Sequence, residues 1–133
     1  MMGGRGMMGS DAYTGGSYDP EQIVAHLEAM IPRHEAYLAT LEGQLAEAED
    51  EQRIALLTRR VEMQQLQIAY LKGKLPVAQA LPAEWPDGAI ALAEYDVAFF
   101  SSATAVDPWV ESWIAHRLER AEQRLAYLQE QQQ

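Results

Sequence analysis

Histidine and methionine are the side chains of this sequence that could bind a soft metal ion, because it contains no cysteine. His26, Met30 and His34 follow one another at spacings of four residues, so they share one face of any helix that contains them. Imidazole and thioether groups suit Cu(I) or Ag(I) where thiolate is missing. These three residues are the first candidate metal ligands. The alternative is that Met30 packs in a core, His34 is a hydrogen-bonded core histidine and His26 lies on the surface.

Four further methionines stand near the start of the sequence, in MMGGRGMMGSDAYTGGSYD. They are Met1, Met2, Met7 and Met8. A glycine-rich segment can wrap several thioethers around Cu(I) or Ag(I) without backbone strain, which makes these methionines a second candidate ligand set. Residues 1–19 have no helical or strand periodicity, so they are predicted to form a flexible arm.

The same arm could instead bind a protein partner or a second copy of the chain. A glycine-rich segment has too little apolar surface to offset the entropy of ordering it alone, so other contacts would have to hold it. The anchors would be its largest apolar or amphipathic side chains. These are Met7, Met8, Tyr13 and Tyr18.

Enzymatic function is not indicated by any motif. The sequence lacks a glycine-rich phosphate loop, a Ser-His-Asp set, an H-E-x-x-H motif and a pair of E-x-x-H motifs. A formal net charge of −10 would repel nucleic acid and anionic membranes. The longest apolar stretch, residues 89–106, contains Glu94 and Asp96 and is not expected to span a membrane. We therefore expect a protein or a metal ion as partner.

Two apolar seams with helical spacing predict a first helical hairpin over residues 20–75. Asp19-Pro20 is typical of a helix start, and His34 and Gln64 are the polar members of the seams. The phase of the apolar stripe reverses between the seams, which predicts a turn within residues 47–52, with Gly43 as the alternative break. Pro32 is expected to kink the first helix.

A proline-rich segment, residues 76–88, is expected to be a loop leading to a second hairpin over residues 89–133, in which Asp107-Pro108 starts the last helix. An internal repeat supports two similar hairpins, because R-V-E and A-Y-L at residues 60–71 recur as R-L-E and A-Y-L at residues 117–128, with an offset of 57. The prediction is an all-α protein: one four-helix bundle, residues 20–133, preceded by the arm.

The run HLEAMIPRHEA, followed by QQLQIAYL at residues 64–71, resembles a secreted bacterial domain-of-unknown-function family with a ferritin-like helical fold. That family carries an M-I-P-H-H signature and a later Q-x-x-E-I-x-x-M. The resemblance is best over residues 21–75, and DVAFF at residues 96–100 is similar to the segment that precedes the signature. It implies a ferritin-like bundle and a periplasmic or other extracytoplasmic location, with any signal peptide absent from this chain. It also implies copper or silver binding, as in some members.

Met30 and His34 match the metal-associated positions of that family. Three other positions differ: Arg33 replaces its second histidine, Thr40 a later methionine, and Leu71 the methionine of the second helix. Arginine donates no lone pair and would oppose a metal ion unless Glu35 or Glu62 paired with it. Two functions are therefore predicted. One is an extracytoplasmic protein that binds Cu(I) through Met30, His34, His26 and the arm. The other is a non-enzymatic accessory subunit of a larger assembly, such as a membrane protein complex, with the arm as a docking strap.

Overall fold

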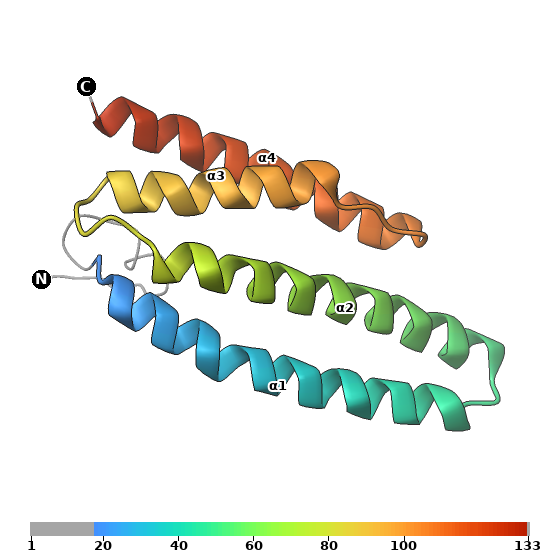
Figure 1. Cartoon of the computed structure of the whole chain (residues 1–133). Coiled ribbons are helices and arrows are strands. Elements are labelled where there is room, and N and C mark those ends of the chain that lie inside the picture. Colours follow the sequence, from blue (N-terminus) through green and yellow to red (C-terminus); the bar gives the residue numbers. More distant parts are fainter. Residues whose placement is uncertain (1–17, 133) are drawn as a thin grey trace, which may run out of the picture.

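The computed structural model describes residues 18–132, and this part of the chain contains four α-helices and no strand. The helices are α1 (Pro20–Glu47), α2 (Glu51–Gln79), α3 (Asp87–Ser102) and α4 (Pro108–Gln131). Helix α1 packs along α2 and α3 packs along α4, so two hairpins lie against each other as a bundle (Figure 1). The predicted all-α class and the two hairpins are confirmed. The finer ferritin-like assignment remains a prediction.

The turn between α1 and α2 falls within the predicted residues 47–52. Gly43 lies inside α1, so the alternative break at this glycine is wrong. The turn contains neither glycine nor proline; instead, the carboxylate of Asp50 accepts a hydrogen bond of 2.9 Å from the N–H of Arg53. This N-cap satisfies one of the free amides at the start of α2 and so favours a new helix there.

Two prolines lie within helices. Helix α1 continues through Pro32, and α2 continues through Pro76 as far as Gln79. The expected loop at residues 76–88 is therefore shorter and occupies residues 80–86. Ala78, which is 2% exposed, packs in a cluster with residues of α1 and α3, and this burial stabilises the last turn of α2 despite the amide that Pro76 lacks.

The two hairpins share their N-capping chemistry. Asp107 caps α4 by accepting hydrogen bonds from the N–H groups of Trp109 and Val110, at 2.7 and 3.3 Å. Asp50 and Asp107 are 57 residues apart, which is also the offset of the sequence repeat. The second helix of each hairpin thus begins at an equivalent position.

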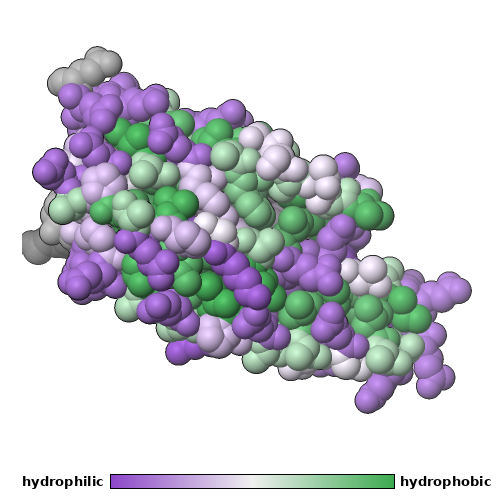
Figure 2. Space-filling view, viewed as in Figure 1, coloured by the Kyte–Doolittle hydropathy of each residue, from purple (hydrophilic) through white to green (hydrophobic). Residues whose placement is uncertain are grey.

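Helix α2 is the central element, because it contacts α1 on one side and both α3 and α4 on the other (Figure 1). Two of its faces are consequently buried. One carries Leu57, Gln64 and Ile68, and the other carries Tyr70 and Lys74. The closed end of the α1–α2 hairpin projects beyond the turn that joins α3 to α4 (Figures 1 and 2). The turn between α3 and α4 therefore lies against the side of α2 and not at its end.

Candidate functional site

The predicted metal face lies on α1, and its three residues differ in exposure. His26 is exposed, whereas Met30 and His34 are half-buried. The three residues therefore lie on one helix, as predicted, and a neighbouring helix packs along α1. That helix is α2.

Gln64 of α2 occupies the position opposite His34. Its side-chain amide, which is only 6% exposed, donates to the Nδ1 atom of His34 and also to the backbone oxygen of His34, at 3.3 Å for the second contact. A neutral imidazole has one nitrogen that accepts and one that carries a proton. Because Nδ1 accepts from Gln64, the proton lies on Nε2. In this arrangement the lone pair of His34 is already used by a protein donor.

The acidic residues that could have neutralised Arg33 are engaged elsewhere. Glu35 forms an ion pair with Lys72 of α2, with 2.7 Å between Oε2 and Nζ. Glu62 binds backbone amides of the turn between α3 and α4. Within residues 18–132, no three His, Cys, Asp or Glu side chains are grouped so that they could hold a metal ion. Metal binding by Met30, His34 and His26 remains a prediction.

Most of the predicted arm lies outside the described residues, including Met1, Met2, Met7, Met8 and Tyr13. Tyr18 is described. Its hydroxyl donates a hydrogen bond of 2.7 Å to the backbone oxygen of Pro82, and the same hydroxyl lies where a Cβ on Gly88 would be. Tyr18 thus fastens the start of α1 to the connection between α2 and α3 of the same chain.

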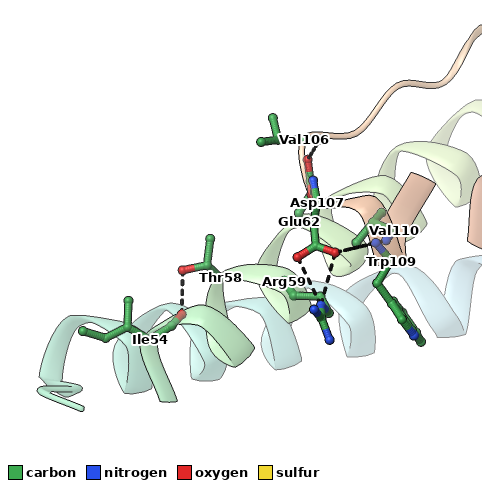
Figure 3. A network of polar contacts seen from close by, with 8 residues as sticks. All are labelled: Ile54, Thr58, Arg59, Glu62, Val106, Asp107, Trp109 and Val110. Atoms are coloured by element: carbon green, nitrogen blue, oxygen red, sulfur yellow. Dashed lines mark hydrogen bonds and ion pairs between the residues drawn. The ribbon is translucent and has the colours of Figure 1, made fainter. Parts of the chain in front are cut away.

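A polar clasp holds the turn between α3 and α4 on the side of α2 (Figure 3). The carboxylate of Glu62 accepts hydrogen bonds from the backbone N–H groups of Val106 and Asp107, at 2.6 and 3.0 Å. The Nε of Arg59 lies 3.1 and 3.2 Å from the two carboxylate oxygens of Asp107. Two side chains of α2 therefore hold three groups of this turn: the N–H of Val106, and the N–H and carboxylate of Asp107.

The clasped turn and the first turn of α4 each display a large apolar side chain. Val106 is 92% exposed and Trp109 is 53% exposed. The guanidinium carbon of Arg59 lies 5.7 Å from the centre of the Trp109 ring, which restricts the ring further. Figure 2 shows hydrophobic surface at this end of the second hairpin. Apolar side chains on a fixed backbone lose little entropy on binding, so this turn has the properties of a protein contact site.

Asp107 takes part in the clasp through both its backbone N–H and its side-chain carboxylate. Desolvation alone would raise the pKa of its carboxyl group, but hydrogen bonds from Arg59 and from the N–H groups of Trp109 and Val110 outweigh it and lower the pKa. The carboxylate form is therefore favoured in the folded protein.

A buried polar triad that was not predicted from the sequence joins α2 to α3. The hydroxyl of Tyr70 donates to Asp96 at 2.7 Å and accepts from Nζ of Lys74 at 2.6 Å, while Nζ lies 3.5 Å from the same carboxylate. Burial raises the pKa of Tyr70 far above its ordinary value. The signal in the sequence was the spacing of Met63, Leu66, Tyr70 and Lys74, a second stripe on α2 at helical intervals.

Comparison with family models, curated proteins and solved structures finds no significant match for this chain. The resemblance to the M-I-P-H-H family therefore remains a prediction. Within residues 18–132, no helix has the length and apolar character needed to cross a membrane.

Proposed function

We propose that this chain is a non-enzymatic accessory subunit that binds another protein through the turn between α3 and α4 together with the first turn of α4. The observation that supports the proposal is the combination of a backbone fixed by Glu62 and Arg59 with two exposed apolar side chains, Val106 and Trp109. The clasp joins the two hairpins, and it also holds the backbone beneath these two side chains in one conformation. A fixed backbone of this kind suits a preorganised contact site, because little entropy is lost on binding.

The partner is expected to offer an apolar pocket bordered by basic residues. Trp109 and Val106 supply the apolar contact, and tryptophan is enriched among the residues that dominate binding energy. The chain carries a formal charge of −10, so a basic border would add electrostatic complementarity and speed association. A ferritin-like bundle with a degenerate metal site would fit such an accessory role.

Purification from native cells with matched variants tests the proposal. The wild-type chain is expected to copurify with one defined protein in stoichiometric amount. Trp109→Ala is expected to weaken that complex by about thirtyfold or more, because loss of a central aromatic contact costs at least about 2 kcal/mol. Tyr37→Ala is the control, since Tyr37 is similarly exposed, at 48%, but lies on α1.

A photo-crosslinking residue in place of Val106 gives a second readout, because it reports which chain touches the turn. Crosslinks to the copurifying protein would support the proposal. Crosslinks to a second copy of this chain would replace the proposal by self-association. Equal retention of the partner by Trp109→Ala and Tyr37→Ala would contradict it.

A further inference from the structure

A cationic groove lies between α3 and α4 and continues toward α2. It consists of two adjoining cavities of about 620 and 300 Å³. Four basic residues are found in their lining: Lys74, Arg117, Arg120 and Arg124. Asp96 is the acidic residue of that lining. This composition contrasts with the whole chain, in which acidic residues outnumber basic ones by 20 to 10.

The three arginines share one face of α4. Arg117, Arg120 and Arg124 are separated by three and four residues, which is the spacing that aligns side chains along a helix. All three line both cavities. Like charges at this spacing repel one another, so they weaken the isolated helix rather than stabilise it. An anion bound between them would reverse that effect.

Contacts with neighbouring side chains hold two of these four basic residues, Arg117 and Lys74, in place. The guanidinium carbon of Arg117 lies 4.8 Å from the centre of the Phe100 ring and 5.4 Å from the centres of the Tyr70 and Trp113 rings. Lys74 is 6% exposed and is held by Tyr70 and Asp96. These two cations are therefore fixed before any ligand binds.

Within residues 18–132, Asp96 forms no ion pair with Arg117 or Arg120. Its carboxylate accepts from Tyr70 and pairs with Lys74. Among the ion pairs of residues 18–132, none includes Arg117 or Arg120. Arg120 is exposed in the groove, where its guanidinium donors can reach a ligand.

We propose that this groove binds a small organic phosphate. The guanidinium fork matches phosphate oxygens in pairs, which explains why arginine rather than lysine dominates the face of α4. The ring of Tyr127, 54% exposed, and that of Phe100 line the larger cavity and would contact the organic part of the ligand. The cavity volumes are in the range of small-molecule sites. This site is distinct from the turn proposed to bind a protein.

Titration calorimetry with pyrophosphate as the probe tests the inference on the full chain. We expect binding that weakens with added salt, and an affinity at least about tenfold lower in Arg120→Gln, because a charge-assisted hydrogen bond is lost. The matched control is Arg60→Gln. Arg60 is the counterpart of Arg117 in the sequence repeat, is exposed on α2 and does not line either cavity. The Arg60→Gln variant should bind pyrophosphate with the same affinity as the wild type.

Two further probes separate phosphate recognition from charge alone. Citrate carries a similar charge on carboxylates, and a poly-glutamate peptide mimics an acidic protein segment. Pyrophosphate is expected to bind more tightly than either. Equal or tighter binding of citrate or of the peptide would overturn the assignment to phosphate. Absence of pyrophosphate binding at millimolar concentration, or equal weakening in Arg60→Gln, would overturn the site. Circular dichroism of both variants is the check that the helices are intact.

Discussion

The guanidinium of Arg59 on α2 lies 3.1 Å from the carboxylate of Asp107, which is also the N-cap of α4. One carboxylate therefore serves both the start of a helix and the contact between the two hairpins. Glu62 strengthens this contact from the next turn of α2 by binding the same segment of backbone. The stability of the bundle should consequently respond to the charge of Asp107.

Asp107→Asn is expected to lower the melting temperature at neutral pH and to lose this effect in acid. Asparagine caps helices about as well as aspartate, so the substitution removes mainly the charge. The pKa of Asp107 is lowered in the folded protein. Its contribution is therefore present above the unfolded pKa of about 4 and is lost as the pH falls through the lower folded value. Melting curves at pH 7 and at about pH 3 measure the difference.

Asp50→Asn is the control for that experiment. Asp50 is the equivalent N-cap of α2, and none of the ion pairs within residues 18–132 includes it. We expect a smaller change in melting temperature at pH 7 than for Asp107→Asn. A larger or equal change would show that capping, and not the pair with Arg59, accounts for the effect.

Two adjacent leucines of α2 should differ sharply when truncated. Leu57 is 1% exposed, whereas Leu56 is 40% exposed. Leu57→Ala is expected to reduce the free energy of unfolding by about 2–5 kcal/mol, because it leaves a cavity in the core. Leu56→Ala should cost less than about 1 kcal/mol. Chemical denaturation measures both values, and similar losses would mean that the register of α2 against α1 is different.

The fold was predictable where apolar spacing and capping residues act together. Asp19 and Asp107 each precede a proline at a helix start, and both begin helices in the structure. Pro76 was misleading because local preference is only part of the free energy. Burial of Ala78 against residues of α1 and α3 outweighs the lost hydrogen bond, and this packing depends on residues distant in sequence.

The site was less predictable because it depends on contacts between helices. His34 and Gln64 were identified as polar residues within apolar seams, but their mutual hydrogen bond required the register of α1 against α2. Arg117 and Tyr70 belong to different hairpins, and their proximity depends on how the hairpins pack. The spacing of residues along one helix does not show which residues of another helix they will contact.

Tyr70→Phe is expected to destabilise the protein by about 1–3 kcal/mol. The substitution keeps the ring but removes the hydroxyl that joins Lys74 to Asp96, and so leaves buried polar groups with fewer partners. The free energy of unfolding measured in denaturant gives the magnitude. Tyr127→Phe is the matched control, because Tyr127 holds the equivalent position in the repeat and is 54% exposed. A cost for Tyr127→Phe as large as for Tyr70→Phe would contradict the role of the triad.

Alkaline pH should lower the stability of the wild-type protein more than that of the Tyr70→Phe variant. Burial raises the pKa of Tyr70 in the folded state. The neutral phenol therefore contributes stability that is fully present below the unfolded pKa of about 10 and is lost as the pH rises above it. Wild-type protein is expected to lose more stability between about pH 9 and pH 11 than Tyr70→Phe does. Parallel losses would mean that Tyr70 ionises as it does in the unfolded chain.

The Cu(I) prediction can be tested through the hydrogen bond between His34 and Gln64. If Met30 and His34 bind Cu(I), the double substitution Met30→Ala and His34→Ala lowers the affinity measured by competition with a chelator. Gln64→Ala should then raise the affinity, because it releases the Nδ1 lone pair that Gln64 now occupies. Full affinity in the double variant would exclude the site on α1. A chain lacking residues 1–10 would then show whether Met1, Met2, Met7 and Met8 hold the ion, since thioethers alone can bind Cu(I).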